Sequence, residues 1–374
     1  MALTNKLSAI GDAIRAKTGK SELLTLDAMP AAIGGIETGG GGSIEVEPLV
    51  LTGNCNSACK GVMPSAYIKV LGDTVSTKDI TYAENMFTNY TNETIPFELN
   101  FKSDTAATAG YLFYGSSLKE LPAVNNLKIS SSRSMFQTCY HLREIPEDWA
   151  STWDWSSIHT KTYDGYCDKM FMSCNSLRRI PESFLSQCYH KGNNSNTVYN
   201  YGFQYCFALD EIRGLPVHPG ALSSNQFATT FVSCTRLKDI IFAMNEDGTP
   251  QTAPWTGAQT IDLSNVGWND KASHDYTKWN SGITNDKQVA TDATYQALKN
   301  DPDWWAQHEN YSRYNHDSAV NTINSLPDAS ATGKTHTIKF KGTAGSETDG
   351  GAINTLTEEE IAVATAKGWT VTLV

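Results

Sequence analysis

Four cysteines hold the same position in a repeated phrase of the sequence, and their thiols could do chemistry. Each follows a phenylalanine by three residues: Cys139, Cys174, Cys206 and Cys234. Such thiols can bind a metal ion or pair as disulfides, but a free cysteine is commonly a small buried hydrophobic residue. If they lie on helical turns, neighbouring turns are about 8–10 Å apart, beyond the roughly 7 Å reach of a disulfide. We therefore predict that all four are core residues.

The remaining cysteines give no metal-binding pattern. Cys55 and Cys59 could be a loop pair or half of a metal site, but no second Cys/His pair at zinc spacing follows them. Cys167 and Cys188 fall outside the repeated phrase. We predict that the protein has no metal site and needs no cofactor.

Two candidate phosphate-binding motifs occur in the sequence, but each lacks a glycine that such a loop requires. Two Gly-Lys-Ser/Thr triplets begin at Gly19 and Gly333. A phosphate-binding loop needs another glycine five residues earlier, where this chain has Ile14 and Asp328. Neither a Gly-x-Ser-x-Gly elbow nor a His-Glu-x-x-His helix occurs in the sequence.

Acidic and histidine side chains leave a weaker case for catalysis. Glu144 and Glu147, or the run 358–360, could supply the acid and base of a glycosidase. A solvated face and a helix N-terminus explain these carboxylates better. The eight histidines are scattered in polar stretches, and a catalytic partnership between one of them and a serine or cysteine stays open. We predict that the protein has no catalytic residues and is not an enzyme.

Aromatic side chains gather in the segments between copies of the phrase. Trp and Tyr on loops offer large, rigid contact areas to sugar rings or protein surfaces, although they could equally be buried between successive coils of the chain. The segment NTVYNYGFQY (196–205) contains Tyr205 in addition to Tyr199 and Tyr201. The residues that we predict to contact a receptor are Trp149, Trp153, Trp155, Tyr166, Tyr199 and Tyr201.

The repeated phrase must position all of these residues. Its four clear copies are MFQTCYHLREIP (135–146), MFMSCNSLRRIP (170–181), GFQYCFALDEIR (202–213) and TFVSCTRLKDII (230–241). A repeat of this kind predicts a solenoid in which each coil covers its neighbour. We expect Phe and Cys to point inward from a helical turn, and Leu and Ile to point inward from a strand. Two degenerate copies come earlier, the second (112–122) with Gly115 at the cysteine position.

These copies resemble the BspA type of leucine-rich repeat, with units that read roughly Met-Phe-x-x-Cys-x-x-Leu-x-x-Ile-Pro. The resemblance covers about half of the chain, which we divide as repeats over 80–270. The four clear copies lack the Leu-x-Leu strand motif of the horseshoe-shaped repeats. The resemblance implies a leucine-rich-repeat-like solenoid and a binding function, as in surface adhesins and phage-tail adhesion proteins.

The first 36 residues are expected to attach the protein to something else. The segment 1–36 is similar to the start of tail and baseplate-associated structural proteins of phages that infect Gram-positive bacteria, and a flexible Gly-rich linker, 37–43, follows it. The resemblance implies docking on the virion as part of a homo-oligomer, with a trimer as one option. The apolar residues that we expect to dock are Leu7, Ile10, Ile14, Leu26, Met29 and Ile33.

Two further units flank the repeats. Residues 44–79 alternate like a small β segment that covers the first coil. Residues 271–374 are expected to form a small α/β cap with helices over 289–300, 316–329 and 357–368 and strands over 336–342 and 369–374. Thr357 and Glu360 are spaced as a capping box. The predicted fold class is thus α+β.

Composition limits the partners. The formal net charge is −11 over 374 residues, with no basic block, which argues against nucleic acid and anionic membranes. The sequence has no run of eighteen apolar residues and no apolar signal core. We predict a phage tail structural and receptor-binding protein, made in the host cytoplasm and located in the virion, with other tail proteins and a host receptor, protein or glycan, as partners. The alternatives are a bacterial surface or secreted leucine-rich-repeat adhesin and, less favoured, a glycan-degrading tail enzyme.

Overall fold

The protein is a mixed α/β structure with short parallel sheets and few helices. A computed structural model describes residues 11–12, 49–61, 75–160, 167–188, 201–216, 227, 229–234, 236–255, 257–267, 313–342 and 352–374. The strands are β1 (Leu49–Asn54), β2 (Val75–Tyr82), β3 (Leu99–Asn100), β4 (Ala106–Thr108), β5 (Val124–Asn125), β6 (Lys128–Ser131), β7 (Glu211–Leu215), β8 (Asp239–Phe242), β9 (Thr260–Leu263), β10 (His336–Phe340) and β11 (Trp369–Leu373). The helices are α4 (Ser156–His159), α5 (Glu182–Leu185), α10 (His316–Ser325) and α11 (Glu358–Ala366), with 3-10 turns η3 (Ser330–Thr332) and η4 (Ile353–Thr355).

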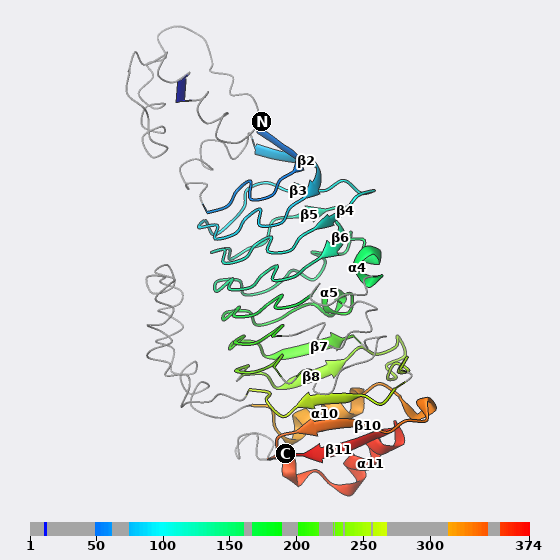
Figure 1. Ribbon diagram of the computed structural model, residues 1–374. Coiled ribbons are helices and arrows are strands. Elements are labelled where there is room, and N and C mark those ends of the chain that lie inside the picture. The colour runs from blue at the N-terminus through cyan, green and yellow to red at the C-terminus, as the bar shows by residue number, and fades with distance from the viewer. Residues whose placement is uncertain are drawn as a thin grey trace, which may run out of the picture.

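Successive passages of the chain stack on one another, and we call each passage a coil. The strand pairs β1–β2, β3–β5, β4–β6 and β7–β8 and the three-stranded sheet β9–β10–β11 are all parallel. Figure 1 shows the coils arranged along one axis, with α4 and α5 beside the stack and α10 and α11 at its C-terminal end. Each strand pairs only with strands of neighbouring coils, so the sheets are small while the stack as a whole is long.

The repeated phrase forms one edge of this stack, which we call the turn edge, and its geometry differs from our prediction. The Phe136 N–H donates to the carbonyl of Met170 at 2.9 Å, and the Phe171 N–H donates to that of Gly202 at 2.9 Å. Within one coil, the Cys139 N–H donates back to the Phe136 carbonyl at 3.0 Å. Backbone groups therefore alternate between the same coil and the next, so the predicted helical turn is wrong. Coils at this edge have the spacing of paired strands, about 4.8 Å, and not that of packed helices.

Left-handed residues make this succession of turns possible. In most coils the residues two before and two after the Phe have positive φ: Asn85 and Asn89, Tyr111 and Gly115, Ser134 and Thr138, Lys169 and Ser173, and Tyr201 and Tyr205. A non-glycine residue in this conformation costs roughly 1–2 kcal/mol. The hydrogen bonds between coils and the burial of the residues between these positions offset that cost.

A column of phenylalanine rings fills the interior behind the turn edge. Neighbouring rings have centroids 5.2–5.8 Å apart and planes within 22° of parallel. The rings are those of Phe87, Phe113, Phe136, Phe171, Phe203 and Phe231, all at most 1% exposed. Stacked aromatic pairs add about 0.5–1.5 kcal/mol each beyond their burial. The Leu and Ile positions of the four clear copies are buried as well, as predicted.

The four repeat cysteines are core residues, as predicted, but for a different reason. Each thiol donates to the Phe carbonyl of the preceding coil: Cys139 to Phe113, Cys174 to Phe136, Cys206 to Phe171 and Cys234 to Phe203, at 2.9–3.0 Å. All eight cysteines are free and buried. Burial raises the pKa of the Cys139 and Cys167 thiols to about 12. Cysteine suits this position because it is small and apolar, and its S–H satisfies a buried carbonyl.

The predicted alignment of the second degenerate copy was wrong by one residue. Ser116, rather than Gly115, occupies the cysteine position, because its N–H donates to Phe113 as that of Cys139 donates to Phe136. The Ser116 Oγ lies 3.4 Å from the Cys139 Sγ. Gly115 instead holds the left-handed position of Thr138, where an added Cβ would lie 2.3 Å from the Asn89 Oδ1.

The C-terminal elements continue the stack. β10 pairs with β9 on one side and β11 on the other. Helix α10 packs on β8, where the Thr322 Oγ1 donates to the Ile240 carbonyl at 2.8 Å and the Ser325 Oγ accepts from the Phe242 N–H at 3.1 Å. The predicted helices at 316–329 and 357–368 and strands at 336–342 and 369–374 are confirmed with shorter bounds. The capping box of Thr357 and Glu360 is present.

Several predictions fall outside the described residues. These are the linker 37–43, the helix at 289–300, and the expected docking residues Leu7, Ile10, Ile14, Leu26, Met29 and Ile33. In the predicted β segment 44–79, β1 and the start of β2 are described and pair in parallel. In the part of the chain that is described, no helix has the length and apolar character needed to cross a bilayer.

Candidate functional site

The three tryptophans that we expected to contact a receptor are buried. Trp149, Trp153 and Trp155 are 8%, 7% and 6% exposed. Ring centroids lie 4.6 Å apart for Trp149 and Trp153, and 5.6 Å apart for Trp153 and Trp155. Phe184 of α5, from the next insertion, contacts all three rings at 5.5–6.1 Å. The insertions of two successive coils thus fold onto each other and exclude water, so these rings belong to the core.

Two of the three indole N–H groups of this tryptophan cluster donate to backbone carbonyls. The Trp149 Nε1 donates to the Pro122 carbonyl at 2.7 Å, and the Trp153 Nε1 donates to the Val124 carbonyl at 3.0 Å. Each bond satisfies a carbonyl of the preceding coil and fixes the indole orientation. The prediction of receptor contact is therefore corrected for the three tryptophans. Phe184, one insertion later, was the signal in the sequence that could have indicated a buried cluster.

Of the three tyrosines that we expected to contact a receptor, only Tyr201 lies within the described residues. Tyr166 and Tyr199 lie outside the described residues. Tyr201 is half-buried on the turn edge, two residues before Phe203, with the Lys169 Nζ 5.6 Å from its ring centroid. Such a cation–π contact holds the ring against the preceding coil.

Three more tyrosines lie, like Tyr201, within two residues of a repeated Phe on the turn edge. Tyr111 and Tyr114 flank Phe113, and their ring centroids lie 5.7 Å apart. Tyr205 follows Phe203, contacts the Phe207 ring at 6.2 Å, and has its pKa raised by burial. All are half-buried. We name Tyr111, Tyr114, Tyr201 and Tyr205 the tyrosine stripe. Sequence reasoning missed Tyr111 and Tyr114 because it looked for aromatic residues in the insertions, although their offsets from the repeated Phe mark them as edge residues.

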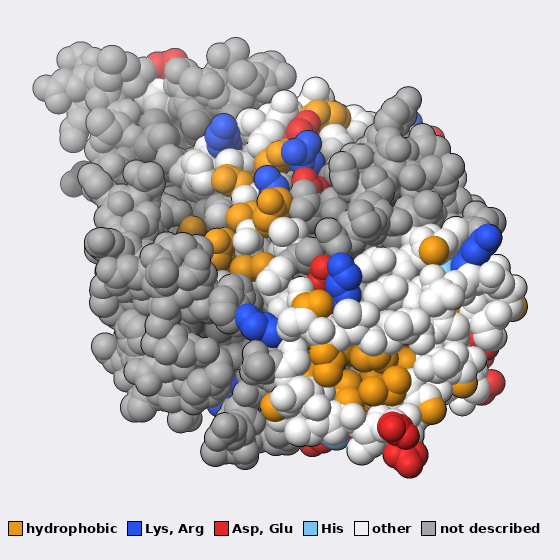
Figure 2. All heavy atoms as spheres, turned by 60° about the horizontal axis from the view of Figure 1, so that its bottom comes forward, with side chains coloured by type: hydrophobic (Ala, Val, Ile, Leu, Met, Phe, Trp, Pro, Cys, Tyr) orange, Lys and Arg blue, Asp and Glu red, His pale blue; other side chains and the backbone are white. Residues whose placement is uncertain are grey.

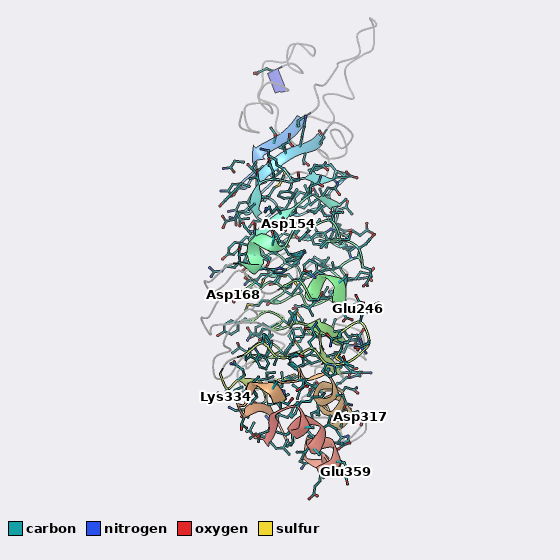
Figure 3. The ribbon with its side chains drawn as sticks, turned by 90° about the vertical axis from the view of Figure 1, so that its right-hand side faces the viewer. Asp154, Asp168, Glu246, Asp317, Lys334 and Glu359 are labelled. Carbon is teal, nitrogen blue, oxygen red and sulfur yellow. The ribbon has the colours of Figure 1, made fainter. Side chains whose placement is uncertain are left out.

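One buried carboxylate lies at the same edge. Asp168 precedes Lys169, and its Oδ2 is 3.9 Å from the Arg133 Nε, while its Oδ1 has no hydrogen-bond partner. Burial raises its pKa despite the nearby positive charges. Figure 3 places Asp154 and Asp168 at successive levels along the stack. Among the described residues, no cluster of three or more His, Cys, Asp or Glu side chains is arranged to hold a metal ion.

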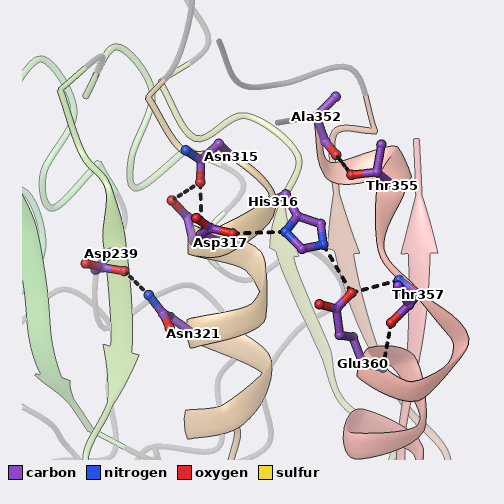
Figure 4. A network of polar contacts seen from close by, with 10 residues as sticks. Asp239, Asn315, His316, Asp317, Asn321, Ala352, Thr355, Thr357 and Glu360 are labelled. Carbon is purple, nitrogen blue, oxygen red and sulfur yellow. Dashed lines mark hydrogen bonds and ion pairs between the residues drawn. The ribbon is translucent and has the colours of Figure 1, made fainter. Parts of the chain in front are cut away.

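A second polar network lies in the C-terminal unit (Figure 4). His316, at the start of α10, contacts the Asp317 Oδ1 and the Glu360 Oε2, each at 3.1 Å. Hydrogen bonds to these carboxylates raise the pKa of His316. Glu360 also accepts from the Thr357 N–H at 2.7 Å, which lowers the pKa of Glu360. The network therefore joins the first turns of α10 and α11.

The C-terminal end of the stack exposes apolar side chains. Figure 2 looks toward this end and shows a hydrophobic patch low in the view, surrounded mainly by uncharged surface. Val363 of α11, Leu373 of β11 and Val374 are among the most exposed large hydrophobic residues of the described chain.

Comparison of the chain with protein-family models, with curated proteins and with solved structures finds no match. The fold and its surfaces therefore have to carry the functional argument by themselves.

Proposed function

We propose that this chain is a leucine-rich-repeat-like solenoid that acts as a phage tail receptor-binding protein. Its N-terminal 36 residues dock on the virion, and the stack presents one long side to a receptor on the host cell surface. The protein binds rather than catalyses. Weak contacts at each copy become strong attachment when many copies on one particle engage together.

One observation carries this proposal: the interior of the coils is constant, whereas the exterior varies. Phe, Cys, Leu and Ile repeat inside the stack, each at most 4% exposed in the four clear copies. The outward positions of the same coils hold tyrosine, lysine, serine, threonine, glutamine and methionine in no fixed order. A uniform interior supports a long, rigid surface, and a variable exterior is what recognition of a particular partner requires.

Two other functions remain alternatives. A bacterial surface or secreted adhesin would use the same stack, and only the resemblance of residues 1–36 to phage tail proteins favours the virion. A glycan-degrading tail enzyme would need two carboxylates facing one groove. Asp168 is the buried carboxylate at the turn edge, and the charged groups that act on it are the cations Lys169 and Arg133.

The test combines binding and assembly. Fluorescently labelled full-length protein should decorate cells of at least one strain in a broad Gram-positive panel, without releasing reducing sugar from their walls. Light scattering should report an oligomer for the full chain and a monomer after residues 1–42 are removed. Failure to decorate any strain would contradict receptor binding, sugar release would favour the enzyme, and a monomeric full chain would contradict docking through a homo-oligomer.

A further inference from the structure

We propose that the tyrosine stripe binds an uncharged glycan chain that runs along the stack. This inference rests on the proposed function, because it names the surface and the ligand class that receptor binding would use. The stripe consists of Tyr111, Tyr114, Tyr201 and Tyr205, and the buried tryptophans take no part in it.

The backbone fixes where the four rings lie. The Tyr111 N–H donates to the Arg133 carbonyl at 2.8 Å, and the Tyr205 N–H donates to the Val232 carbonyl at 3.0 Å. Tyr111 and Tyr201 each lie two residues before a repeated Phe, in coils that are three steps apart. At about 4.8 Å for each step, the two tyrosine pairs are separated by about 14 Å along one edge.

Backbone conformation shows that three of the four rings occupy positions that do not require an aromatic side chain. Tyr111, Tyr201 and Tyr205 have φ of 55°, 53° and 64°. Bulky residues are disfavoured in this left-handed region, where glycine and asparagine are tolerated. Other coils have Asn89 or Gly115 at the position of Tyr205. The turn itself needs no aromatic ring, and strained residues gather where function requires them.

The chemistry between the two pairs suits hydroxyl-rich ligands. Gln137 lies in the coil that follows Tyr111 and Tyr114, and its amide group can donate and accept hydrogen bonds. Tyrosine offers an apolar face for the C–H side of a sugar ring and a hydroxyl at its tip. The net charge of −11 disfavours polyanionic chains, and Lys169, a cation at the stripe, already contacts the Tyr201 ring.

The size of the stripe favours a glycan over a protein. A tyrosine buries about 150–250 Å² when fully covered, so four half-buried rings offer roughly 300–500 Å². A stable protein interface takes about 800 Å² from each partner. A narrow line of rings with polar groups between them matches a thin linear ligand, and a protein receptor becomes an outcome of the test.

The decisive variant removes the rings without endangering the turns. The triple substitution Tyr111→Asn, Tyr201→Asn and Tyr205→Asn places asparagine at left-handed positions that it tolerates well. Thr138→Asn is the matched control, because it makes the same change at an equivalent position and removes no ring. Labelled full-length proteins are compared on a strain that the wild type decorates, with neutral polysaccharide isolated from that strain's wall as competitor.

We expect the triple variant to bind the cells at least about tenfold more weakly, as loss of a binding hot spot does. The Thr138→Asn variant should bind like the wild type, and the neutral polysaccharide should compete. Unchanged binding by the triple variant would overturn the inference and leave the proposed function standing. So would loss of binding after protease treatment of the cells without competition by polysaccharide. If the wild type decorates no strain, the proposed function fails, and this inference fails with it.

Discussion

Two groups of aromatic side chains belong to the same stack, and they differ in solvent exposure: one is buried and the other is half-buried. The tryptophan cluster of Trp149, Trp153 and Trp155 is packed against Phe184, and two of its indole N–H groups donate to backbone carbonyls. The tyrosine stripe is half-buried and in part strained, with φ between 53° and 64° at three of its members. The cluster contributes stability, whereas the stripe is maintained against a local cost. Aromatic content alone therefore does not identify a binding surface.

The largest change in the free energy of unfolding should come from a substitution in the tryptophan cluster. Trp149→Ala should destabilise the protein by about 3–5 kcal/mol, because it opens a cavity and leaves the Pro122 carbonyl without its donor. Urea unfolding, followed by circular dichroism, measures this loss. Trp149→Phe, which keeps most of the ring volume, should cost less. A loss below about 1 kcal/mol for Trp149→Ala would show that the cluster is not part of the core.

Asp168, beside the stripe, should show that this edge is not optimised for stability. Its Oδ1 has no hydrogen-bond partner and burial raises its pKa. The native state therefore holds this proton more tightly than the unfolded state, so stability falls as pH rises from the usual Asp pKa through the raised one. Asp168→Asn should stabilise the protein at pH 7 by about 1–3 kcal/mol and remove that part of the pH dependence. A destabilised variant with an unchanged pH profile would show that the carboxylate is well paired.

The His316 network should give a smaller effect, confined to the C-terminal unit. The pKa of His316 is raised from its usual 6.5. Its contribution is therefore fully present below pH 6.5 and is lost as pH rises through the raised value. Glu360, with its pKa lowered from 4.5, contributes above pH 4.5 and loses its contribution as pH falls. His316→Gln should cost about 0.5–1 kcal/mol near pH 5.5 and nothing near pH 9. Thermal unfolding of the full chain at these two pH values measures the difference, and an equal cost at both would exclude the charged contact.

The smallest effect should come from the stripe itself. Tyr205→Asn relieves a left-handed tyrosine and loses a ring contact with Phe207, two terms of similar size near 1 kcal/mol. We expect a net change in the free energy of unfolding within about 1 kcal/mol, measured by urea unfolding. A loss above about 3 kcal/mol would mean that Tyr205 is a core residue like the tryptophans.

Much of the interior could be predicted from the sequence, and much of the edge could not. The repeated Phe, Cys, Leu and Ile are buried as expected, and the capping box at Thr357 is present. A spacing of three residues between Phe136 and Cys139 fits a helical turn, in which residues i and i+3 share a face. It also fits a chain of single turns, in which the N–H of residue i+3 donates to the carbonyl of residue i. Only the left-handed residues distinguish the two, and tyrosine or lysine in that conformation leaves no signal in the sequence.

The tryptophans were misjudged because the length of an insertion does not reveal which way it folds. Trp149 is covered by Phe184 of the next coil, a contact between residues 35 positions apart in the sequence. The hydrogen bond from the Cys174 thiol to the Phe136 carbonyl likewise joins residues that are far apart in the sequence. Such contacts depend on the register of neighbouring coils, which the spacing of the repeats only approximates.

A paired measurement on two variants tests most directly whether stability and binding reside in different aromatic groups. The unfolding midpoint and the affinity for a decorated Gram-positive strain are measured for Trp149→Ala and for the triple variant Tyr111→Asn, Tyr201→Asn and Tyr205→Asn, at a temperature where both are folded. We predict that the tryptophan variant loses stability and keeps its affinity, and that the tyrosine variant keeps its stability and loses affinity. The reverse pattern, or a parallel loss of both quantities in both variants, would contradict the division of roles.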